Sequence, residues 1–88
     1  MLTMQDIIDF CDIGHAETEV IADHQGIPMA SAAELGMRLL GSPEGLLQLQ
    51  GMMLDNMRHA LENGHGEQLA AVTRTFLDFQ RSYLAAAA

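Results

Sequence analysis

The sequence predicts an all-α protein of about five helices, folded as a single domain over residues 1–88. Glycines and prolines divide the chain into five segments whose apolar residues recur at helical spacing. No segment shows the alternation and β-branched enrichment of a strand. The composition, 49% hydrophobic and 18% charged, is typical of a chain with a packed core. A chain of this size buries only about two-thirds of its unfolded surface, so we expect self-association to enlarge the core.

Residues 1–41 are predicted to form an acidic three-helix unit. The first helix runs from Thr3 to about Gly14, and the second from about His15 to Gln25, with Gly26 at the left-handed position that ends a helix. Pro28 opens the third helix, and Gly41 closes it. The expected inward side chains of the three helices are Met4, Ile7, Ile8 and Cys11; Ala16, Val20, Ile21 and His24; and Met29, Ala32, Ala33, Gly36 and Leu40.

Residues 42–84 are predicted to form a long antiparallel helical hairpin. Ser42 and Pro43 are typical of a helix start, and the helix extends to about Glu62 with Gly51 as a mid-helix weakness that a close packing contact would explain. A turn over residues 63–66 leads to the last helix, and residues 85–88 form a tail with no assigned function. The expected inward stripes are Leu46, Leu49, Met53, Met57, Ala60 and Leu61, then Leu69, Val72, Thr73, Phe76, Gln80 and Tyr83.

The segment EVIADHQGIPMASAAEL, residues 19–35, resembles the helix-turn-helix motif in outline. Gly26 takes the place of the turn glycine, and Ala22 that of the small residue four positions before it, whereas Gln25 departs from the usual apolar residue. The resemblance implies a DNA-binding regulator whose second helix enters the major groove. That helix offers one serine, one acid and no base, within a segment that repels phosphates. We therefore expect no nucleic-acid partner and interpret the outline as helix packing.

Charge is distributed unevenly along the chain. Residues 1–37 carry seven acidic residues and no Lys or Arg, which accounts for most of the formal net charge of −8. The four arginines are expected to pair with carboxylates three or four positions away. The leading hypothesis is a non-enzymatic protein–protein interaction module, a small regulator or adaptor that presents its acidic N-terminal face to a basic protein surface. The residues proposed to carry this contact are Asp6, Asp9, Asp12, Glu17 and Asp23.

Metal or cofactor binding is the alternative from a different class. His15, Glu19 and Asp23 follow one another at four-residue steps, a spacing that can converge on a metal ion, but one helix supplies an open and incomplete shell. We therefore predict no metal site and no cofactor. His24 falls in the last turn of its helix, where a structural role or a pH-sensitive contact is expected.

Catalysis and membrane insertion find little support. The sequence shows no Ser/His/acid set, and the single cysteine, Cys11, has only His15 near it as a base. No apolar run approaches the ~20 residues of a membrane span. The acidic start of the chain does not look like a secretion signal, so a cytoplasmic location is expected, with homodimerisation through the long helices as a separate expectation.

Overall fold

The structure, a computed structural model, describes residues 14–84 of the chain. Of these residues 86% are helical and none lies in a strand, which confirms the all-α prediction. The elements are α2 (His15–Gln25), α3 (Met29–Leu39), α4 (Pro43–Glu62) and α5 (Gly66–Phe79), followed by a π-helical turn η1 (Gln80–Leu84). The predicted first helix, residues 3–14, lies outside the described residues apart from its last position, so the count of about five stays a prediction.

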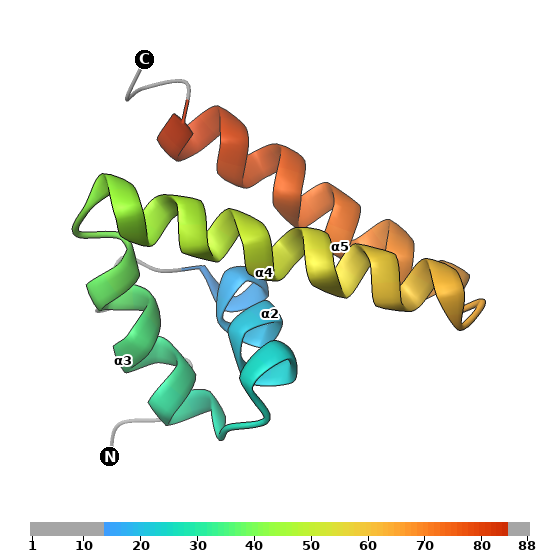
Figure 1. Cartoon of the computed structure of the whole chain (residues 1–88). Helices are drawn as coiled ribbons and strands as arrows, with labels where there is room; N and C mark the ends of the chain where they lie inside the picture. The colour runs from blue at the N-terminus through green and yellow to red at the C-terminus, as the bar shows by residue number, and fades with distance from the viewer. Residues whose placement is uncertain (1–13, 85–88) are drawn as a thin grey trace.

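The long helices α4 and α5 lie side by side and run in opposite directions (Figure 1). Helix α2 packs against both of them, and α3 contacts α2 and α4. The principal extents are 38 × 34 × 18 Å. Since a helix with its side chains is about 10 Å across, the shortest extent leaves room for about two helix layers. A body this thin leaves one side of each long helix facing solvent.

Two glycines in the left-handed region make the turns that set this arrangement. Gly26 ends α2 at φ 65° and ψ 39°, directly after Gln25, where the sequence placed the helix end. Gly64 has φ 69° in the turn between α4 and α5. An L side chain is strained in this conformation, so glycine is favoured at both positions.

The start of α4 matches its sequence signal. The Ser42 hydroxyl accepts a hydrogen bond from the backbone N–H of Gly45 at 3.0 Å, and Pro43 occupies the first helical position. The limits of α3 differ slightly from the prediction. Pro28 is the capping residue before the helix rather than its first residue, and the helix ends at Leu39. Leu40 is the residue that caps the end of α3, and it has right-handed helical angles. The helix therefore ends before Gly41 and without a left-handed glycine.

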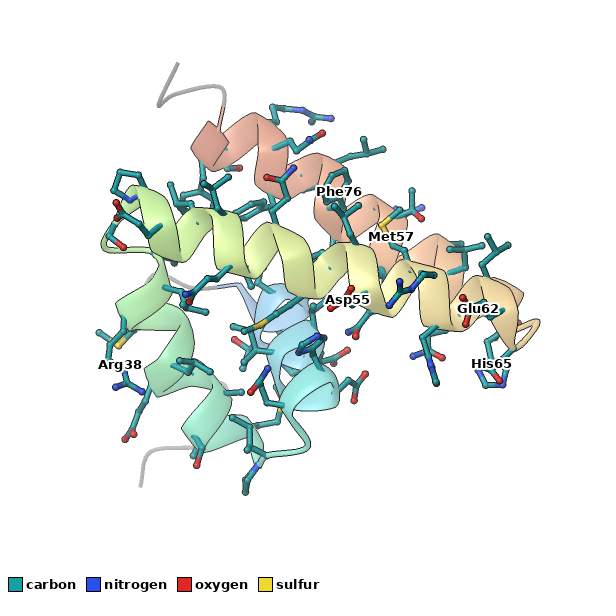
Figure 2. All side chains as sticks on the ribbon, in the orientation of Figure 1. Arg38, Asp55, Met57, Glu62, His65 and Phe76 are labelled. Carbon is teal, nitrogen blue, oxygen red and sulfur yellow. The ribbon has the colours of Figure 1, made fainter. Side chains whose placement is uncertain are left out.

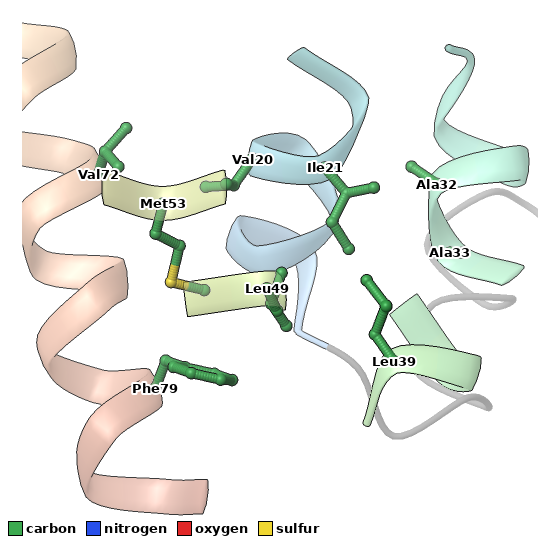
Figure 3. Packing of buried hydrophobic residues seen from close by; sticks show 9 residues of the cluster. All are labelled: Val20, Ile21, Ala32, Ala33, Leu39, Leu49, Met53, Val72 and Phe79. Atoms are coloured by element: carbon green, nitrogen blue, oxygen red, sulfur yellow. The ribbon is translucent and has the colours of Figure 1, made fainter. Parts of the chain in front are cut away.

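The core lies where α2, α4 and α5 meet. Leu49 and Met53 of α4 stand between Val20 and Ile21 of α2 on one side and Phe79 of α5 on the other (Figure 3). Ala32 and Ala33 of α3 are also fully buried, and their small side chains let α3 approach α2 closely.

Several expectations about the inner faces are wrong. Leu61 is 67% exposed and Ala16 is exposed, although both were placed inside. Phe79, the largest of the fully buried side chains, lies outside the predicted stripe of α5. A Cβ atom added at Gly51 would meet none of the described residues within 4 Å, so no close packing contact with residues 14–84 accounts for this glycine.

Candidate interaction surface

A polar cleft of about 320 Å³ lies between the C-terminal half of α2 and the C-terminal half of α4. Three carboxylates and one guanidinium line it, which gives a charge of −2 with neutral histidines. The lining residues are Asp23, His24, Asp55, Asn56, Arg58, His59 and Glu62. The cleft thus carries a local excess of negative charge at the junction of two helices.

His24 links the two walls of the cleft. Its Nε2 atom lies 3.0 Å from Oδ2 of Asp55, and its Nδ1 atom lies 2.7 Å from Nε2 of Gln25. When the Gln25 amide donates to Nδ1, the proton of the neutral imidazole is on Nε2 and is donated to Asp55. The predicted structural role of His24 therefore has a specific partner 31 positions away in the sequence. Its predicted pH sensitivity stays a prediction.

Arg58 continues this polar chain along α4. Its Nη2 atom lies 3.6 Å from Oδ1 of Asp55, and its Nε atom lies 4.0 Å from Oε1 of Glu62. The three side chains are between 54% and 71% exposed. Pairs this exposed contribute about 0–1 kcal/mol each, so their carboxylates keep most of their hydration and stay accessible to a second cation.

A second hydrogen bond fixes the floor of the cleft. The side-chain amide of Asn56 donates to the backbone carbonyl of Val20 at 3.2 Å. Asn56 lines the cleft on α4, and Val20 is a residue of the buried core on α2. The spacing between Asp23 and the acids of α4 is therefore set by core packing rather than by the surface ion pairs.

The predicted partner-binding acids are only partly visible in the structure. Glu17 is half-buried in the first turn of α2, and Asp23 is exposed at the rim of the cleft. Neither makes an ion pair with any of residues 14–84. Asp6, Asp9 and Asp12 lie outside the described residues, so their role in a partner contact stays a prediction.

The candidate metal ligands of α2 do not form one group. His15 Nε2 contacts Glu19 Oε1 at 2.6 Å, with both side chains more than half exposed. Asp23 belongs instead to the wall of the cleft. Within residues 14–84, no three His, Cys, Asp or Glu side chains converge in a way that could hold a metal ion.

The prediction that all four arginines pair with nearby carboxylates is wrong. Only Arg58 does so among the described residues, and Arg38, Arg74 and Arg81 make no ion pair there. Helical spacing makes such pairs possible, but an exposed pair gains too little to hold two long side chains in one conformation. Unpaired charge is therefore present on α3 and α5 as well as on α2.

Sequence reasoning missed the α4 half of the cleft. Asp55, His59 and Glu62 follow one another at three- or four-residue steps, which places them on one side of the helix. That spacing was visible in the sequence. What the sequence does not contain is the contact with His24, because only the tertiary fold brings α2 against this side of α4.

Comparisons with protein-family models, with curated protein sequences and with solved structures find no match for this chain. None of the described helices combines the length and the apolar character that crossing a membrane requires.

Proposed function

We propose that this protein is a non-enzymatic interaction module that binds a basic segment of a partner protein in the cleft between α2 and α4. The observation that carries the proposal is the cleft itself, which is lined by three carboxylates from two helices and a single guanidinium. Asp23, at the rim, makes no ion pair among the described residues. A Lys or Arg side chain entering between Asp23 and Glu62 would relieve the repulsion among these acids.

The charge around the cleft favours a basic partner protein over an acidic one. Helix α2 contains no Lys or Arg, and Arg58 is the only arginine on α4. The nearest strong cation is therefore already shared between Asp55 and Glu62. An approaching basic segment meets an excess of carboxylate, which favours fast, salt-sensitive association.

The exposed side of α3 argues against the DNA-binding reading of the helix-turn-helix outline. Its exposed side chains are Ser31, Glu34, Met37 and Arg38, so one base is offset by one acid. A recognition helix needs several groups that donate to base edges, with cations that hold phosphates around it. We assign the outline formed by α2 and α3 to packing.

The test is an affinity capture with two matched charge variants. The cleft variant carries Asp23→Asn and Glu62→Gln, and the control variant carries Glu34→Gln and Glu67→Gln, so both lose two exposed acids. We expect the wild-type protein and the control to retain the same basic partner at about 50 mM salt, and the cleft variant to lose it. Retention should fall for every form at about 300 mM salt.

Two outcomes would overturn the proposal. One is that no partner is retained at low salt by the wild-type protein. The other is that the cleft and control variants weaken retention equally, because this would mean that net charge and not the cleft recognises the partner.

A further inference from the structure

Helix α4 exposes a row of three leucines, Leu47, Leu54 and Leu61, which are 64%, 45% and 67% exposed. They are seven residues apart, so they lie on one side of the helix, with a drift of about 20° per step, along about 21 Å of its length. Helices that pack against one another in coiled coils carry apolar residues at two positions of each seven-residue repeat, and the leucines occupy one of these positions. We call this row the leucine ridge.

The ridge continues onto α5. Leu77 is 52% exposed, and Met57 and Phe76 are half-buried between α4 and α5 (Figure 2). Leu54 comes ten residues before the turn at Gly64, and Leu77 comes thirteen residues after it. Measured along the hairpin axis, the two residues are therefore within about one helical turn of each other. The hairpin therefore exposes large apolar side chains on both of its helices at a similar height, and we call the ridge and Leu77 together the apolar strip.

The strip is opposite in character to the polar cleft and separate from it. The cleft is lined by charged and amide side chains of α2 and α4. Arg58 comes four residues after Leu54 and three before Leu61, so it lies beside the ridge and marks the border between the two surfaces. The ridge leucines are not among the residues that line the cleft. Large exposed apolar residues gathered in one strip are typical of a contact surface.

We propose that the leucine ridge and Leu77 form the contact of a symmetric homodimer, in which a second copy of the chain packs its hairpin against this one. This inference does not depend on the proposed binding of a basic partner. The two contacts use different residues and respond in opposite ways to salt, since an apolar interface is not weakened by screening.

The symmetry of the ridge favours a second copy as the occupant. A two-fold interface requires a patch that is complementary to itself. Leu47 and Leu61 are equally far from Leu54, so an axis through Leu54 places Leu54 against its own counterpart and Leu47 against the partner's Leu61. The two α4 helices then run antiparallel, and every ridge leucine faces a leucine.

The size of the hairpin face also fits a dimer. Helix α4 has 20 residues, which span about 30 Å, and two helices side by side are about 20 Å wide. The resulting plane of about 600 Å² on each copy would bury about 1,200 Å² in total, which is the lower end of the range for specific, stable interfaces. A flat molecule with a shortest extent of 18 Å gains a second layer over its hairpin in this way.

The experiment is sedimentation equilibrium of the full chain over a wide range of concentration, with two variants that place a charge at exposed apolar positions. Leu54→Glu lies at the centre of the ridge, and Met37→Glu lies on α3, where Met37 is 48% exposed. We expect a dimer for the wild-type protein and for Met37→Glu, and a dissociation constant raised about 100-fold for Leu54→Glu. Circular dichroism should show the same helix content for all three.

A cross-link tests the position of the axis. In a Cys11→Ser background, Leu54→Cys should form a disulfide-linked dimer on mild oxidation, whereas Met37→Cys should form no disulfide-linked dimer under the same conditions, although it still associates. The proposal is overturned if the wild-type protein is monomeric at all concentrations, or if Met37→Glu dissociates the dimer as strongly as Leu54→Glu. Failure of Leu54→Cys to cross-link would reject the axis through Leu54.

Discussion

Replacing Gly51 by alanine should stabilise the protein. Gly51 lies in the middle of the 20-residue helix α4, and an added Cβ atom would meet no atom of the part of the chain that the structure describes within 4 Å. Glycine in a helix interior costs about 0.8–1 kcal/mol relative to alanine, because the unfolded chain loses more freedom on folding. With no steric cost to offset this gain, Gly51→Ala should raise the free energy of unfolding by about 1 kcal/mol and the melting temperature by about 4–8 °C.

Gly45 supplies the matched control within the same helix. An added Cβ atom there would lie 2.6 Å from both the Cα and the carbonyl carbon of Leu39. Backbone cannot rotate away as a flexible side chain does, so Gly45→Ala should destabilise the junction of α3 and α4 although alanine is the better helix former. The two substitutions are chemically identical, and the structure predicts opposite signs for them.

Urea unfolding followed by circular dichroism measures both effects. The Leu54→Glu background removes any contribution of self-association, because the stability of a dimer depends on its concentration. If Gly51→Ala leaves stability unchanged or lowers it, the position is not open as described. If Gly45→Ala stabilises the protein, the contact between the start of α4 and Leu39 is wrong.

Three further substitutions test the cap, the core and the cleft floor. Ser42→Ala should cost about 1 kcal/mol of unfolding free energy by removing the acceptor for the Gly45 N–H, and a thermal melt equal to wild type would contradict this cap. Phe79→Ala should cost about 3–5 kcal/mol, whereas Met37→Ala should stay within about 0.5 kcal/mol, and similar losses for both would mean that Phe79 is not in the core. Asn56→Ala should cost about 1 kcal/mol and speed amide hydrogen exchange near α2, and unchanged exchange there would deny the link between α2 and α4.

The fold class and several helix limits could be predicted because their signals are local. Gly26 ends α2 by its own backbone conformation, and Ser42 with Pro43 starts α4 through groups within four residues. Such signals need no knowledge of tertiary neighbours. They therefore survive in a single sequence, and the structure confirms them.

The inner faces were predicted less well because each long helix touches more than one neighbour. Helix α5 packs against α4 on one side and α2 on another, so its buried side chains extend beyond a single stripe and include Thr75 and Phe79. On α4 the periodic pattern continues through Leu61, but that leucine is 67% exposed, and none of residues 14–84 covers it. Apolar periodicity identifies a helix and does not distinguish a core contact from a contact with another molecule.

The candidate site could be predicted only in half. The absence of Lys and Arg before residue 38 identified α2 as an acidic element, and Asp23 belongs to the cleft. The other wall comes from α4, and the bond between His24 and Asp55 joins residues 31 positions apart. No periodicity within one helix encodes that distance, so the cleft appears only when the helices are packed.

The central claim is that the cleft between α2 and α4 recognises basic side chains, and a binding map by nuclear magnetic resonance tests it most directly. The labelled protein is titrated with an octalysine peptide at about 50 mM salt, and amide shift changes are followed along the chain. We predict that they concentrate at residues 23–25 and 55–62 and disappear in the Asp23→Asn, Glu62→Gln variant, while the Glu34→Gln, Glu67→Gln variant keeps them. Shift changes spread evenly over all acidic residues, or unaltered in the cleft variant, would contradict the account.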